Sequence, residues 1–156
     1  METYRIQQLE VPPDLLGPLV QYQGEFSDHR ALQETISEHG YLLLRAALDR
    51  SAVLAAREEV MMRLQEVGEI RAPAIDGIAT GSSQRSETAG DLGDFWESVN
   101  QGTALRAVTH GNQLTQLLES VLGEAARPHD LMYLRPVTVG NGTDLHYDYP
   151  FFAGSS

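Results

Sequence analysis

The order of the periodic segments limits the possible folds of this chain more than any other feature, because helical patterns come first and a strand pattern comes only near the end. The late stretch, residues 131–152, reads LMYLRPVTVGNGTDLHYDYPFF. Two runs rich in strand-forming residues flank a Gly-Asn-Gly turn there, which predicts two strands. Helices followed by strands, rather than alternating with them, predict an α+β fold.

The second predicted strand carries His146 and Asp148, two residues apart. Side chains at i and i+2 of a strand project from the same face, so an imidazole and a carboxylate would point together. They are two of the three ligands of the 2-His-1-carboxylate set that holds Fe(II). So short a pattern also arises by chance, on a surface strand whose Asp orients the His. The following Tyr149, Phe151 and Phe152 favour a site, because an ionised Asp buried beside them needs a cation or hydrogen bonds.

Tyr133 and Arg135 form a second i, i+2 pair, one predicted strand earlier. An inward-facing Arg can clamp a carboxylate with two hydrogen bonds, assisted by the Tyr hydroxyl. An outward-facing Arg would form a surface ion pair instead, and the sequence leaves both readings open. The other histidines have no ligand spacing to one another and are predicted to cap, pack or lie on the surface: His29, His39, His110 and His129.

Composition excludes several classes of function. The chain has 156 residues, no cysteine and no lysine, so disulfides, thiolate zinc sites and lysine Schiff bases are ruled out. Its net charge of -11 opposes non-specific binding of nucleic acid. No apolar run is long enough for a membrane span, and the first residues do not resemble a signal peptide, so a cytoplasmic location is expected. The oligomeric state is not indicated.

Three helices are predicted from apolar periodicity and from the residues that begin and end them. The first begins after Ser27 or Asp28 and stops at Gly40, the second begins after Asp49 and stops at Gly68, and the third runs from about Gln113 to Leu122 and stops at Gly123. Residues 1–26 are predicted to form an irregular arm with a short strand around Tyr4 to Leu9, and Tyr41 to Leu44 a buried strand. Residues 71–93 are predicted to form a long loop. A short helix is predicted from Asp94 to Val99, with Trp96 in the core.

Two stretches resemble the phytanoyl-CoA dioxygenase family of Fe(II)- and 2-oxoglutarate-dependent oxygenases. One is EHGYLLLR, residues 38–45, with the helix that Asp49 begins. The other combines the helix that ends at Leu122-Gly123, the strand over residues 131–137, and His146-Tyr147-Asp148. Together they cover about residues 27 to 152, in the order in which the family has them.

The resemblance implies that N-terminal helices pack on the beginning of a double-stranded β-helix, or jelly roll. It implies that His146 and Asp148 ligate Fe(II) and that 2-oxoglutarate is the co-substrate, bound near Tyr133, Arg135 and Tyr147. Tyr147 holds a variable place between the ligands. The implied activity is a dioxygenase that uses O₂ to hydroxylate a small organic or acyl substrate.

The chain departs from the family pattern at its C-terminal side. The family has a second histidine far downstream and, soon after it, an arginine for the distal carboxylate of 2-oxoglutarate, and neither position occurs here. A jelly roll needs about eight strands, and residues 131–152 supply two or three. The expectation is therefore one incomplete domain, with a helical part at 1–129 and the first strands of a truncated jelly roll at 130–156.

Two other classes of protein stay open. If the chain ends at Ser156, the missing ligands favour a non-catalytic binding or interaction domain with a degenerate or absent metal site. A different metal-dependent jelly-roll enzyme, such as a cupin, ranks last, because it would lack the helical N-terminal part.

Overall fold

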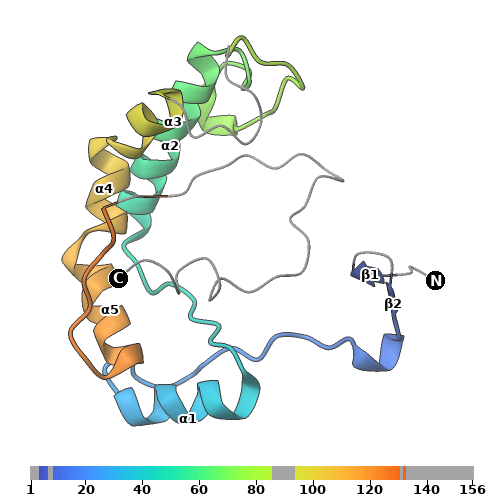
Figure 1. Ribbon diagram of the computed structural model, residues 1–156, viewed down its shortest axis with the longest axis vertical. Helices are drawn as coiled ribbons and strands as arrows, with labels where there is room; N and C mark the ends of the chain where they lie inside the picture. The colour runs from blue at the N-terminus through green and yellow to red at the C-terminus, as the bar shows by residue number, and fades with distance from the viewer. Residues whose placement is uncertain (1–3, 7–8, 86–93, 131, 133–156) are drawn as a thin grey trace, which may run out of the picture. The chain divides into compact units, whose positions relative to one another are not determined.

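The computed structural model describes residues 4–6, 9–85, 94–130 and 132. The chain divides into two compact units, and residues 4–20 belong to a different unit from residues 21–134. The larger unit contains the helices α1 to α5 (Figure 1).

The N-terminal unit contains a small antiparallel hairpin. Strand β1, Tyr4–Ile6, pairs with β2, Leu9–Val11, so that Tyr4 lies opposite Val11. Arg5 and Glu10 face each other across the pair and form an ion pair of 3.0 Å. A short 3₁₀ helix, η1, follows at Pro13–Leu15. The sequence predicted one short strand here, and the structure has two.

Helix α1, His29–His39, begins and ends where the sequence predicted. The side chain of Asp28 accepts a hydrogen bond from the Ala31 amide at 3.1 Å, and this satisfies a backbone donor that the first turn leaves free. Gly40 ends the helix with φ of 73°, a conformation that costs a side-chain-bearing residue energy. Leu32, which is fully buried, anchors the inner face of the helix.

Helix α5, Asn112–Leu122, packs beside α1 and ends at Gly123 with φ of 75°. Its last carbonyl groups receive hydrogen bonds from α1: His29 Nδ1 lies 2.9 Å from the Ser120 oxygen, and Gln33 Nε2 donates to the Val121 oxygen. Two side chains of one helix thus satisfy acceptors that the end of another leaves without an intrahelical partner.

Helix α2, Arg50–Glu66, begins at Asp49 as predicted and ends two residues before Gly68, which has φ of 76°. The apolar residues predicted to share one face of this helix are only partly buried; they are Val53, Val60, Met61, Leu64 and Val67. Leu64 is in the core and Val60 and Met61 pack against it, whereas Val53 is 39% exposed. The predicted amphipathic pattern is therefore confirmed at the C-terminal half of the helix.

Helix α4, Thr103–Thr109, was not predicted from the sequence, and it lies side by side with α2 (Figure 1). The Glu59 carboxylate of α2 accepts hydrogen bonds from the Ala104 amide at 3.2 Å and the Leu105 amide at 2.9 Å. A carboxylate is favourable at a helix N-terminus because the free amides and the helix dipole both attract negative charge. A side chain 45 residues away in the sequence thus caps this helix.

Helix α3, Asp94–Asn100, confirms the predicted short helix and the burial of its tryptophan. Trp96 and Val99 are 4% and 2% exposed and form the core of this unit with Leu64 and Ile70. The core therefore joins α2, the segment after it and α3.

The predicted strand from Tyr41 to Leu44 is wrong. These residues are half-buried, and within the described chain only Leu43 makes a β-bridge, with Gln21, supported by a hydrogen bond of 3.1 Å from the Tyr22 amide to the Leu43 oxygen. A strand needs a neighbour that pairs along its length, and the described residues supply one at a single position.

The predicted loop over 71–93 is irregular as far as it is described, to residue 85. It contains a short 3₁₀ helix, η2, at Ala74–Asp76, and a β-bridge between Ile70 and Ala79. Arg57 of α2 donates a hydrogen bond to the Ile75 oxygen, and Thr80 Oγ1 donates to the Gly68 oxygen at 2.6 Å. The described part of the loop is therefore held against α2.

The predicted jelly-roll strands at 130–156 lie almost entirely outside the described residues, so the α+β jelly-roll assignment and the single incomplete domain stay predictions. Among the described residues, no helix is both long enough and apolar enough to cross a membrane.

Candidate functional site

The five predicted site residues lie outside the described part of the chain. They are the metal ligands His146 and Asp148 and the co-substrate residues Tyr133, Arg135 and Tyr147. Their roles stay predictions. Met132, which immediately precedes Tyr133, is described, and its carbonyl oxygen is held by Asn100 of α3.

The described residues do not themselves form a metal centre: no group of three or more His, Asp or Glu side chains among them could hold a metal ion. The histidines predicted to have structural roles make such contacts. His29 binds the end of α5, and the ring of His39 lies 5.9 Å from that of Tyr41. His110 lies 2.9 Å from Thr109 Oγ1 and 3.2 Å from the His129 oxygen.

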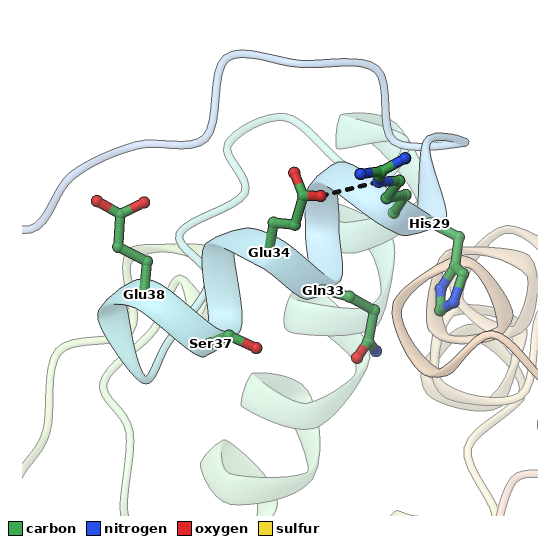
Figure 2. Close-up of a pocket in the computed structure, with 6 residues that line it drawn as sticks. His29, Gln33, Glu34, Ser37 and Glu38 are labelled. Atoms are coloured by element: carbon green, nitrogen blue, oxygen red, sulfur yellow. Dashed lines mark hydrogen bonds and ion pairs between the residues drawn. The ribbon is translucent and has the colours of Figure 1, made fainter.

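A shallow hollow on α1 is wide open to solvent (Figure 2). His29, Gln33 and Ser37 line it together with Arg30, Glu34 and Glu38. The dashed line from Glu34 in Figure 2 is its ion pair with Arg30, 2.8 Å long. This pair raises the pKa of Arg30, first through the hydrogen bond that Arg30 donates to Glu34 and then through the negative charge of Glu34. His29 and Gln33 are engaged by α5, and Arg30 and Glu34 by each other, so the fold accounts for these four side chains.

Arg85 contacts two aromatic rings and a carboxylate beside the core. The Arg85 guanidinium carbon lies 5.2 Å from the centre of the Phe95 ring and 5.0 Å from that of Trp96. Its Nε donates to Glu69 Oε1 at 2.6 Å, and the two side chains are only 11% and 14% exposed. Stacking on aromatic faces and pairing with a carboxylate are contacts that guanidinium makes better than ammonium. The cluster connects the loop to α3.

Asn100, the last residue of α3, contacts Met132, the described residue that directly precedes the predicted site residue Tyr133. It is 7% exposed, and its Nδ2 donates to the Met132 oxygen at 2.7 Å. Sequence reasoning did not single out Asn100, Arg85 or Glu69. A signal was present for Asn100, because it follows Trp96 by four residues and so shares the apolar face of the helix.

Two other described groups have shifted pKa values: Asp49 at the start of α2, and Tyr22 in the segment before α1. The pKa of Asp49 is lowered, first by a hydrogen bond from the Ser51 hydroxyl and then by one from the Ala52 amide. The pKa of Tyr22 is raised by desolvation and then by the charges of Asp28 and Glu25. The shift at Asp49 reflects helix capping, and the shift at Tyr22 reflects desolvation and nearby negative charge.

One characterised enzyme is similar to most of the chain. The chain is 30% identical over 149 residues to 1-deoxypentalenic acid 11-beta-hydroxylase from Streptomyces exfoliatus. The match covers 92% of this chain and 44% of the hydroxylase, so the chain spans less than half the length of that relative. No protein-family profile matches the chain, and no solved structure matches it.

Proposed function

We propose that the protein is an Fe(II)- and 2-oxoglutarate-dependent oxygenase of the phytanoyl-CoA dioxygenase type, which hydroxylates a small organic or acyl substrate. The observation that carries the proposal is the similarity to a hydroxylase along nearly the whole chain. That relative is named for a reaction on an organic acid, which supports the same broad substrate class here. The His146-Tyr147-Asp148 pattern and the family resemblance of residues 27 to 152 support the proposal independently.

The donor set suits the proposed metal. An imidazole and a carboxylate are ligands that non-haem Fe(II) accepts, and His146 and Asp148 would hold it. No second histidine and no arginine follow Asp148 in these 156 residues. The proposal therefore requires the whole protein to supply the third ligand and the arginine of the family pattern.

The chain's own residues would bind and orient the co-substrate. Arg135 would attract a carboxylate of 2-oxoglutarate by charge and by paired hydrogen bonds, and the Tyr133 hydroxyl would donate another. Tyr147, between the two ligands, would close one side of the site. The bound metal would supply the oxidation of a C–H bond by O₂, coupled to decarboxylation of 2-oxoglutarate.

The test is turnover of 2-oxoglutarate by the protein expressed from its complete reading frame. With Fe(II) and O₂, succinate is expected to form, and His146→Ala is expected to reduce its rate to background because a metal ligand is lost. His39→Ala is the matched control: His39 is an exposed histidine at the end of α1, and its replacement is expected to leave the rate unchanged.

Two results would count against the proposal. Wild-type turnover by His146→Ala would remove the iron assignment of that residue. If the wild-type protein forms no succinate and calorimetry with Mn(II) shows no binding of 2-oxoglutarate at millimolar concentration, the protein belongs to the non-catalytic binding class.

A further inference from the structure

Asn100 is buried in a way that polar side chains rarely are. It is 7% exposed and lies at the end of α3, where Trp96 and Val99 are 4% and 2% exposed. It is the only buried polar residue among those that the structure describes. Burial of an amide side chain costs free energy unless hydrogen bonds compensate it, so its contacts show what the residue does.

The nitrogen of the Asn100 side-chain amide forms a hydrogen bond, and its oxygen has no partner within the described chain. Nδ2 donates to the Met132 oxygen at 2.7 Å, across 32 residues of sequence. A carbonyl oxygen only accepts, so the amide nitrogen must be the atom that faces it. Oδ1 is buried and has no hydrogen-bond partner within the described chain. The donor thus holds the backbone at Met132, and an acceptor beside it is available to another donor.

The contact matters because Met132 lies next to predicted binding residues in the sequence. Tyr133 follows it directly and Arg135 follows three residues later. Helix α3 contributes Trp96 and Val99 to the core cluster, so its hydrogen bond attaches the Met132 backbone to the core. Small displacements of a binding residue weaken binding strongly, because hydrogen bonds depend on distance and angle.

We propose that Asn100 is a positioning residue: its amide fixes the backbone at Met132 and thereby the start of the segment that carries Tyr133. The effect on catalysis rests on the function proposed above, whereas the fixing of the backbone does not. Asn100 acts through the Met132 carbonyl and does not itself contact substrate or metal.

Two substitutions separate the donor from the acceptor. Asn100→Asp has nearly the same shape but places an oxygen, which cannot donate when ionised, against the Met132 carbonyl. Asn100→Leu removes both polar atoms of the side chain at similar volume, and the half-buried Met132 oxygen can accept from water instead, so the variant is expected to fold. Asn112→Asp is the matched control, since Asn112 is exposed at the start of α5.

The first measurement is hydrogen–deuterium exchange of peptides that cover residues 131–137. Both Asn100 variants are expected to exchange about two- to tenfold faster there, which corresponds to the loss of one hydrogen bond. Exchange in α1 and α5 and in the Asn112→Asp protein is expected to match the wild type. Fluorescence of Trp96, the sole tryptophan, reports whether the neighbouring turn of α3 stays packed.

The second measurement is the kinetics of 2-oxoglutarate turnover in the complete protein. The KM for 2-oxoglutarate is expected to rise about tenfold in Asn100→Leu, with a smaller change in kcat, because release of the Met132 backbone would affect Tyr133, which directly follows it, more than the metal ligands. A purely structural role would lower the amount of active protein without changing KM.

Each outcome decides between the two claims. Unchanged exchange at 131–137 with unchanged Trp96 fluorescence would overturn the positioning role, and so would loss of the folded state in both variants. Faster exchange in a protein whose wild type has no turnover would support the anchor and count against the proposed function. Faster exchange with an unchanged KM would show that the fixed segment does not bind the co-substrate.

Discussion

The ion pair between Arg85 and Glu69 is the most buried of those formed by the described residues. Arg85 Nη1 is also buried and has no hydrogen-bond partner among them. Desolvation of two charges offsets much of their attraction, so such a pair contributes little net stability compared with apolar residues of the same size. Removal of one partner is different, because it leaves a charge buried without compensation.

Arg85→Met is therefore expected to destabilise the protein by about 2–4 kcal/mol, since Glu69 would keep a buried charge and Phe95 and Trp96 would lose a stacked cation. Urea denaturation followed by Trp96 fluorescence measures the change.

The double variant Glu69→Leu with Arg85→Met is expected to be more stable than Arg85→Met alone, because no unpaired charge remains. Arg30→Met is the surface control, since the pair of Arg30 with Glu34 is 88% and 65% exposed, and its stability is expected to match the wild type. If Arg85→Met is as stable as Arg30→Met, the buried pair does not hold the loop.

At the scale of helices and strands, hydrogen bonds to the free ends of helices recur through the larger unit. Asp28 and Asp49 cap their own helices from the preceding residue, whereas Glu59 caps α4 from α2. The capping contacts of Asp49 favour its charged form, which lowers its pKa from the ordinary value of 3.8. Protonation must therefore weaken the start of α2.

The stability contributed by Asp49 is expected to depend on pH with a definite sign. Because its folded-state pKa is lower than that of the unfolded chain, the contribution is complete above pH 3.8 and is lost as the pH falls through the lowered pKa. Asp49→Asn keeps a capping oxygen without the charge, so its Tm is expected to be a few degrees below wild type at pH 7 and equal to it near pH 2.

Thermal melts of both proteins between pH 2 and 7 make this comparison. Asp14→Asn, at an exposed residue of η1, controls for the change in net charge. A difference between wild type and Asp49→Asn that stays constant down to pH 2 would contradict the charge-assisted cap.

At the scale of the whole molecule, the proposed metal site makes stability depend on ligands. A ligand that binds only the folded state stabilises it in proportion to RT ln(1 + [L]/Kd). With Mn(II) and 2-oxoglutarate at about one hundred times their Kd, the complete protein is expected to melt about 5–10 °C higher, and EDTA is expected to reverse the shift.

Asp148→Asn is the control for this experiment, since it removes the charge that would bind the metal without changing a residue of α1 to α5. Its Tm is expected to be insensitive to Mn(II). An equal shift in Asp148→Asn would place the metal elsewhere in the molecule.

Local sequence signals were enough to locate α1, α2, α3 and α5, because a cap or a glycine acts on backbone groups within one turn. Asp28, Asp49, Gly40 and Gly123 have the predicted roles. The burial of Trp96 was also predictable, since a large aromatic side chain gains much free energy when its apolar surface is removed from water.

Contacts between distant residues decided the rest. Glu59 stabilises α4 from 45 residues away, and Asn100 holds Met132 from 32 residues away. Residues 41–44 have strand-like composition, yet their only described pairing is the bridge between Leu43 and Gln21. The sequence alone determined where α1, α2 and α5 begin and where α1 and α5 end, because those signals are local. Which helix caps another and which strand finds a partner were decided by tertiary structure, since both depend on groups that only folding brings together.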